Sequence, residues 1–192
     1  LYDPDIVTFQ ESPAEEKVAA VAQVIGRYYA YFPGGFPGAV ISKHPIVESQ
    51  NCPLVKGPRP RDLFTRHWGR AVLEVAAHRL IVYSAHLHPS KPEIRAREVT
   101  EALKSMEHDL AGDVPVLFQG DLNHRPDGPE YRRWEAAGLV DTNTHNEGLA
   151  TSTIPSTTPT ARIDYIWANP ALASRCQSFR VLFEGGFRTN PE

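Results

Sequence analysis

Apolar residues run from Val114 to Phe118 and lead into a short polar segment that contains Gly120, Asp121 and Asn123. A continuous apolar run bounded by turn residues is typical of a strand buried on both faces. Side chains alternate along an extended chain, so Asp121 and Asn123 are expected on one side of it. An acceptor beside a neutral donor at the rim of a sheet can position a water and hold an oxyanion. The alternative is a simple turn, because Gly, Asp and Asn favour turns for local reasons.

The rest of the pattern predicts strands interspersed with helices. Short apolar runs predict strands at residues 5–9, 28–32, 38–42, 71–76, 80–85, 162–167 and 178–183, with a hairpin turn at 77–79. Apolar positions spaced by three and four predict two helices, which are expected to start at the capping segments 12–15 and 90–93. A third, short helix is expected at 130–137.

Polar side chains follow several of these predicted strands. Glu11 comes after the first strand, His86 ends the strand at 80–85, and Asp164 interrupts a strand that is otherwise apolar. Each has an ordinary structural explanation. Glu11 could be a solvated charge at the start of a helix, His86 a structural histidine whose ring nitrogens are hydrogen-bonded, and Asp164 the ion-pair partner of Arg162. A buried Asp needs a partner, and a bound metal or an imidazole is the functional alternative to Arg162.

Hairpins combined with strand–helix–strand units indicate an α/β fold. Apolar central strands with helices outside them predict a four-layer α/β sandwich, in which two packed, mostly antiparallel β-sheets are flanked by helices. The 192 residues fit a single domain, residues 1–192, with no internal repeat or linker. Loops at one end of such a sandwich are where a functional site is usually built.

The composition is that of an ordinary globular chain, with 41% hydrophobic and 22% charged residues. The net charge of −3 gives no global basic field that would attract a polyanion. One local basic patch lies between residues 56 and 70, and it suits an anionic substrate; its cations are Lys56, Arg59, Arg61, Arg66 and Arg70. Aromatic residues around Pro33-Gly34-Gly35 could line a substrate cleft, although packing is the commoner role of such residues.

No apolar run approaches the length of a membrane span, and no signal peptide is visible. The first residue is Leu, so a removed N-terminal segment is an open alternative, and the compartment stays undetermined. The spacing of Cys52 and Cys176 matches no metal-binding motif. We interpret them either as cysteines without a functional role or as one disulfide. Carboxylates, an Asn and His without Cys favour Mg²⁺ or Mn²⁺ over a closed zinc site.

Five motifs in order resemble the endonuclease/exonuclease/phosphatase superfamily, the deoxyribonuclease I-like fold. They are Ile6-Val7-Thr8-Phe9-Gln10-Glu11, Gly38-Ala39-Val40-Ile41-Ser42-Lys43-His44-Pro45-Ile46, Ser84-Ala85-His86-Leu87, Gly120-Asp121-Leu122-Asn123 and Arg162-Ile163-Asp164-Tyr165-Ile166. Each motif alone is weak, but together they cover nearly the whole chain. The resemblance implies metal-dependent hydrolysis of a phosphate ester by an activated water.

The resemblance also implies a role for each site residue. Glu11 is expected to bind Mg²⁺, and Asp121 to orient or deprotonate the attacking water. Asn123 resembles the phosphate-binding amide, His86 the histidine that contacts the phosphate, and Asp164 the carboxylate that supports the site. A divalent ion and fixed donors would stabilise the charge that develops on the phosphate oxygens.

Two parts of the family pattern are missing from the sequence. Family members usually have an earlier strand that ends in a metal-supporting Asn, and a last strand that carries a Ser-Asp-His motif. The chain is therefore either a fragment of a complete enzyme or a degenerate member, and intact remaining motifs favour the fragment. The missing His is ordinarily a principal catalytic group, so the activity of this polypeptide by itself is an open question.

Two other functions compete with the phosphoesterase interpretation. A calcineurin-like metallophosphoesterase would use Asp121, Asn123, His86 and His88, but its early Asp-x-His and its Gly-Asp-x-x-Asp are absent. A non-catalytic member could keep the fold and a phosphate pocket. The expected partner is a phosphate-ester substrate, which could be nucleic acid, a phospholipid headgroup or a small metabolite, and the chain is expected to be a monomer.

Overall fold

The computed structural model describes residues 2–145, 151–155 and 157–182. The strands are β1 (Ile6–Phe9), β2 (Tyr28–Phe32), β3 (Gly38–Ser42), β4 (Ile46–Asn51), β5 (His67–Val75), β6 (His78–His86), β7 (Val116–Asp121), β8 (Val140–Asp141) and β9 (Asp164–Ala168). The helices are α1 (Glu15–Val24), α2 (Pro92–Ala111), α3 (Pro129–Ala136), α4 (Pro170–Ala173) and the 3₁₀ helix η1 (Thr142–His145).

The strands form two sheets, one of three strands in the order β1-β3-β2 and one of six in the order β4-β5-β6-β7-β9-β8. All pairings are antiparallel except that of β6 with β7, which α2 connects as a crossover. A parallel pair needs such a long connection because its strands run in the same direction. The predicted α/β sandwich of two packed, mostly antiparallel sheets with outer helices is confirmed.

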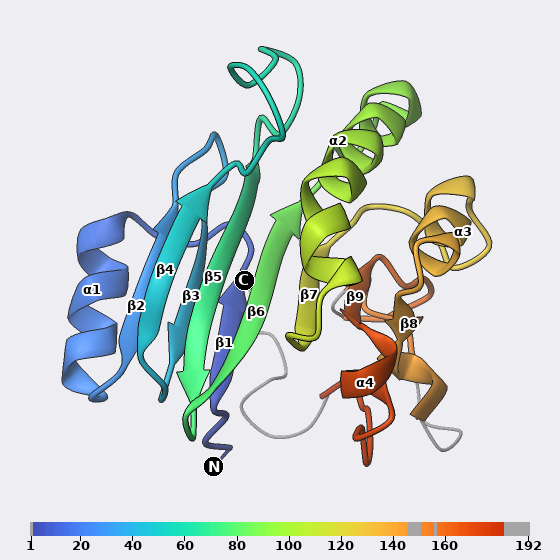
Figure 1. Ribbon diagram of the computed structural model, residues 1–192. Coiled ribbons are helices and arrows are strands. Elements are labelled where there is room, and N and C mark those ends of the chain that lie inside the picture. Colours follow the sequence, from blue (N-terminus) through green and yellow to red (C-terminus); the bar gives the residue numbers. More distant parts are fainter. Residues whose placement is uncertain (1, 146–150, 156, 183–192) are drawn as a thin grey trace.

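The layers are visible in Figure 1, where α1 covers the small sheet on one side and α2 and α3 lie on the opposite side of the molecule. The space between the sheets is filled by small and aliphatic side chains together with one aromatic ring: Ala30, Phe32, Val40, Ala71, Leu73 and Val82. The larger core lies between the six-stranded sheet and its helices, and it is rich in aromatic rings such as Trp68, Phe118 and Trp134. Alternation along each strand of the large sheet therefore sends one set of side chains to α2 and the other to the small sheet.

Several local predictions were wrong at element ends. Helix α1 begins at Glu15 with Ala14 as its N-cap and no side-chain cap, so the predicted capping box is absent. The backbone N–H of Ser12 instead donates to the carbonyl of Pro37, and its hydroxyl donates to the carbonyl of Pro13. Helix α2 has Lys91 as its N-cap, again without a side-chain cap.

Other corrections concern strands and pairs. The β5–β6 turn is formed by Ala76 and Ala77, both with positive φ, one residue earlier than predicted. No strand forms at residues 178–182 of the described chain, because they pair with no neighbouring strand there, and residue 183 lies outside the described residues. Cys52 and Cys176 are both free thiols, so the disulfide alternative is wrong. Among the helices of the described chain, none is both long and apolar enough to span a membrane.

Candidate active site

Four polar side chains lie in one row across the large sheet. The strand register pairs His67 with His86, His86 with Asp121, and Asp121 with Asp164. The ring of His67 contacts Gly38 of β3 closely, so this row is on the face that looks toward the small sheet. The last residue of β6, the last of β7 and the first of β9 thus meet at one end of the two packed sheets. The structure brings together His86, Asp121 and Asp164, as the sequence predicted.

Asp121 lies in an electrostatically unfavourable position. Burial and then the neighbouring negative charge of Asp164 raise the pKa of Asp121 to about 7, with a smaller contribution from Glu11. Its Oδ1 accepts a hydrogen bond from the backbone N–H of Asn123 at 3.1 Å, which acts in the opposite direction. Burial also raises the pKa of Asp164, whose carboxylate accepts a hydrogen bond from the side chain of Thr153. The site therefore holds two partly buried carboxylates side by side.

His86 is neutral at physiological pH in this environment. Burial, together with the positive charge of Arg66, lowers the pKa of His86 to about 4. Its Nε2 lies 3.6 Å from Oδ2 of Asp121, and among the described residues its buried Nδ1 has no hydrogen-bond partner. A neutral imidazole carries one N–H and one acceptor nitrogen. His86 can therefore offer a single directed hydrogen bond to a group that enters the site.

Glu11 approaches the row from the small sheet. It follows β1, is exposed, and adopts a left-handed backbone conformation with φ of 54°. Non-glycine residues at positive φ are uncommon and often mark functional sites, where the surrounding structure holds the strain. Its charge contributes to the raised pKa of Asp121, which places the two carboxylates on the same side of the site.

These carboxylates are chemically suited to a hard divalent cation. Glu11, Asp121 and Asp164 form no ion pair with Lys or Arg within the described ranges, so no direct cationic partner neutralises them. Within those same ranges, no three His, Cys, Asp or Glu side chains converge into a ready-made metal cage. Mg²⁺ is commonly held by one or two carboxylates and keeps several waters, so the donor set fits this ion without a closed cage.

Gly120 makes the row possible at β7. A Cβ atom at this position would lie 1.9 Å from the carbonyl oxygen of Ala85 on β6. Any other residue would push the two strands apart. Gly120 does not end the strand as a simple turn would, because β7 continues to Asp121 and pairs there with both neighbours.

Asn123 connects the row to the loop after β6. Its φ is 53°, and its side-chain Nδ2 donates to the carbonyl of Leu87 at 3.0 Å. The side chain therefore holds the segment that immediately follows His86. The phosphate-binding role expected for Asn123 stays a prediction.

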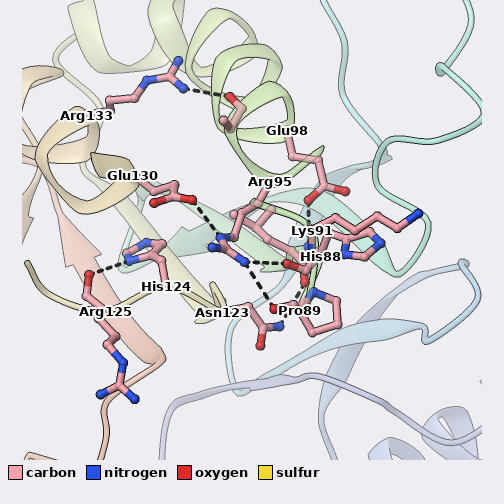
Figure 2. A network of polar contacts seen from close by, with 12 residues as sticks. His88, Pro89, Lys91, Arg95, Glu98, Asn123, His124, Arg125, Glu130 and Arg133 are labelled. Atoms are coloured by element: carbon pink, nitrogen blue, oxygen red, sulfur yellow. Dashed lines mark hydrogen bonds and ion pairs between the residues drawn. The ribbon is translucent and has the colours of Figure 1, made fainter. Parts of the chain in front are cut away.

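Two buried charged residues of α2 hold the same loop, and neither was predicted from the sequence. Nη1 of Arg95 donates to the carbonyls of His88 and Pro89 at 3.0 and 3.3 Å, while its Nε pairs with Glu130 at 2.9 Å. Glu98 accepts the backbone N–H of His88 at 2.8 Å. Figure 2 shows Arg95 reaching from α2 to the loop backbone, with Glu130 behind it. We call Arg95, Glu98 and Glu130 the loop clamp.

A sequence signal for the loop clamp was present. Arg95 and Glu98 precede Val99, Ala102 and Met106 at helical spacing, so they continue the buried face of α2. Charged residues on an apolar helix face need partners, because a buried unpaired charge is costly. Here the partners are the backbone groups that fix the loop after His86.

An open cleft of ≈ 220 Å³ lies beside the row. Thr8 and Gln10 of the small sheet's side line it together with Gln119 and Asp164 of the large sheet. The hydroxyl of Thr8 donates to Oε1 of Gln119 at 3.2 Å and so ties the sheets together next to the site. A small charged group could reach Asp164 through this opening.

Comparisons with known proteins agree with this architecture. A family model described as "Endonuclease/Exonuclease/phosphatase family" matches residues 1–185. The human Nocturnin catalytic domain with bound sulfate is 19% identical, with a TM-score of 0.68 over 87% of this chain and 70% of that chain. A mannosyl-6-phosphatase from Bacteroides thetaiotaomicron is 16% identical, with a TM-score of 0.68 over 87% and 72%.

A third similar structure is a 3′ phosphatase, NExo from Neisseria, bound to a product DNA hairpin. It is 15% identical, with a TM-score of 0.68 over 89% of this chain and 78% of that chain. Comparison with curated proteins gave no significant match.

Proposed function

The chain belongs to the endonuclease/exonuclease/phosphatase family, and from this membership we propose that it is a phosphoric ester hydrolase acting at the row of His86, Asp121 and Asp164. The observation that supports the proposal best is the register, which lines up these three side chains at the end of β6, β7 and β9. A buried neutral imidazole beside two uncompensated carboxylates suits stabilisation of a phosphoryl group and activation of a water. The family match also decides against the calcineurin-like alternative.

Each residue has a role that follows from its surroundings. Asp121 accepts a proton from the attacking water or orients it, and burial makes this carboxylate a stronger base than an exposed Asp. The N–H of neutral His86 donates to a non-bridging phosphate oxygen. Asn123 offers the second amide hydrogen of its Nδ2 to the same group, and Asp164 keeps the local field negative beside the water.

Mg²⁺ or Mn²⁺ is the cofactor that we propose, with Glu11 as its protein ligand. The cation would supply Lewis-acid stabilisation of charge on the phosphate oxygens. The loop clamp and the Asn123–Leu87 hydrogen bond keep the segment after His86 in place. Precise placement matters because small misplacements of a reacting group cost large factors in rate.

The substrate is a phosphate ester, and similar structures include enzymes for both nucleic acid and a sugar phosphate. A net charge of −3 argues against a sequence-blind duplex DNA binder, which would be expected to carry a basic face. We therefore expect a phosphodiester or phosphomonoester of limited size, hydrolysed by a monomer.

The test is hydrolysis of generic phosphomonoesters and phosphodiesters with Mg²⁺ and with a chelator, on this chain and on the full-length gene product. His86→Ala should lower kcat by about 10²- to 10³-fold, comparable to the loss of one oxyanion donor. The matched control is His108→Ala, since His108 is exposed on α2, far along the chain from the row. Absence of hydrolysis in both proteins, with phosphate binding retained, would favour the non-catalytic alternative.

A further inference from the structure

Among the five cations of the basic patch, Arg66 is the one whose charge acts on residues of the candidate site. Arg70 is engaged by Asp109, with Nε and Oδ2 2.7 Å apart, and Nη1 of Arg59 donates to the carbonyl of Phe64 at 3.3 Å. Arg66 forms no ion pair within the described residues, and its buried Nε has no hydrogen-bond partner there. Its guanidinium therefore has no carboxylate partner within the described chain, and it packs over the ring of Phe36.

Arg66 lies beside the row of site residues. Burial and then the positive charge of Arg66 lower the pKa values of His86 and His88, and the same charge opposes the rise of the pKa of Asp121. The affected groups lie on two segments, the end of β6 with the loop that follows it and the end of β7, so the guanidinium lies on the His86 side of the site. A planar guanidinium with free donors is the side chain best suited to bind phosphate in two places at once.

An exposed aromatic ring lies between Arg66 and His86. The guanidinium carbon of Arg66 lies 4.9 Å from the centroid of the Phe36 ring, and the Phe36 and His86 rings are 6.3 Å apart. Phe36 nevertheless keeps 45% of its surface exposed. Phe36 differs in this respect from Phe32 and Phe64, whose rings are fully buried at 0%. An exposed ring next to a charged site offers a surface for a flat ligand group.

Backbone contacts fix this ring and the guanidinium relative to each other. The N–H of Gly35 donates to the carbonyl of Thr65 at 2.7 Å. A Cβ at Gly34 would lie 1.4 Å from the carbonyl oxygen of Arg66, so only glycine permits the approach. The loop that carries Phe36 and the segment that carries Arg66 are therefore docked directly onto one another, next to β5.

We propose that Arg66 and Phe36 form the substrate-recognition element of the site, which selects phosphate esters whose organic group is flat and aromatic. Arg66 binds non-bridging oxygens of the phosphoryl group that His86 faces, and the aromatic group of the ester packs on Phe36. The inference rests on the proposed function, because it takes the His86 side of the row as the place where phosphate binds. It narrows the substrate class beyond a phosphate ester in general.

The test uses two non-hydrolysable probes of equal charge and similar size, phenylphosphonate and cyclohexylphosphonate, with calorimetric affinities measured in the presence of Mg²⁺. Wild type should bind the flat phenyl compound more tightly. Arg66→Gln should weaken the binding of both probes by about tenfold or more, as expected for loss of a hydrogen-bonded charge. Phe36→Leu should instead reduce the preference for phenyl by about two- to tenfold.

Matched controls come from the same surface and the same residue types. Arg61→Gln removes an exposed cation of the basic patch, and Tyr28→Leu removes an exposed ring of β2. Neither should change the two affinities. Arg66→Lys keeps the charge without the planar fork and should bind with intermediate affinity, and Phe36→Tyr should retain the phenyl preference.

Wild-type affinity of Arg66→Gln for both probes, or an unchanged phenyl preference in Phe36→Leu, would overturn the inference. A melting temperature lowered by Phe36→Leu together with an unchanged preference would mean that Phe36 only packs the loop. The outcomes are separable from those of the proposed function. Probe binding that depends on both residues without any hydrolysis would support recognition and reject catalysis, and hydrolysis with no dependence on either residue would do the reverse.

Discussion

Strand β9 separates two carboxylates, Asp141 and Asp121, whose charged surroundings are opposite. On one side, Asp141 of β8 accepts hydrogen bonds from Nη2 of Arg162 at 2.5 Å and from the hydroxyl of Tyr131 at 3.0 Å. On the other side, Asp121 of β7 is paired in register with a second carboxylate, Asp164. Asp141 is buried and Asp121 is partly buried, and negative charge is compensated at the first and concentrated at the second.

This contrast separates charged side chains that stabilise the fold from charged side chains that are suited to a functional site. A buried charge with well-placed partners holds neighbouring elements together, here β8, β9 and α3. Like charges that share a site raise each other's pKa and lower stability, and such arrangements cluster where chemistry occurs. The row at the end of β6, β7 and β9 therefore stands out because its electrostatics are unfavourable without an added cation or substrate.

The largest effect is expected from Asp121→Asn, which keeps the shape and removes the charge. Turnover should fall by about 10²- to 10⁴-fold through loss of the base. Stability should be equal or higher, because Asp164 loses its like-charged neighbour. Kinetics normalised to folded protein measure the first effect and urea unfolding the second. The control is Asp113→Asn, which changes an exposed carboxylate shortly before β7. Near-wild-type turnover of Asp121→Asn would show that the Asp121 carboxylate takes no part in the mechanism.

The same substitution on the other side of β9 should have the opposite result. Asp141→Asn leaves the guanidinium of Arg162 buried and unpaired, which should cost about 3–5 kcal/mol of unfolding free energy. Turnover per folded molecule should be retained, because Asp141 is not in the row. Urea unfolding of this variant and of the double variant with Arg162→Met checks the cause, since the double variant should recover part of the loss. A loss below that of an ordinary surface change would contradict the structural role.

A bound divalent cation should reduce the repulsion between the carboxylates of the site. It should leave the ion pair between Asp141 and Arg162 unaffected. Mg²⁺ at 100 times its dissociation constant should raise the unfolding free energy of wild type by about 2.7 kcal/mol. Glu11→Gln should lose this gain, whereas Glu15→Gln and Asp141→Asn should keep it, because Glu15 is exposed at the start of α1. Denaturant curves with and without Mg²⁺ provide the readout, and equal gains in wild type and Glu11→Gln would rule out Glu11 as the ligand.

Much of this contrast could be predicted from the sequence, but not all of it. The apolar run before Asp121 and the strand before His86 were sufficient to predict two buried neighbouring strands. The partner of Arg162 could not be predicted, because Asp164 is close in sequence whereas Asp141, the actual partner, is brought near only by β8–β9 pairing.

The loop clamp and the recognition element of Arg66 and Phe36 could not be predicted from the sequence for a similar reason. Arg95 and Glu98 bind backbone groups of the loop after β6, and backbone partners leave no residue pattern. Arg66 was visible as one of five cations, and its position beside Phe36 depends on two loops docking through glycines. Local pattern thus predicted the elements, and long-range contacts decided which charges are compensated.

The smallest expected effect concerns His124, which belongs to the compensated side of the contrast. Its Nε2 accepts from Nε1 of Trp134 at 3.1 Å, its Nδ1 lies 3.2 Å from the carbonyl of Arg125, and burial lowers its pKa from 6.5 to about 4. The unfolded chain therefore binds more protons than the folded one between these values, and stability falls as the pH drops from 6.5 toward 4.

His124→Gln can keep both hydrogen bonds without titrating, so it should flatten the decline by up to about 1.4 kcal/mol per pH unit. Part of the slope should remain, because burial lowers the pKa values of His67 and His86 as well. Urea unfolding at several pH values checks this against the exposed control His108→Gln. An identical slope in His124→Gln and wild type would mean that burial does not hold His124 neutral.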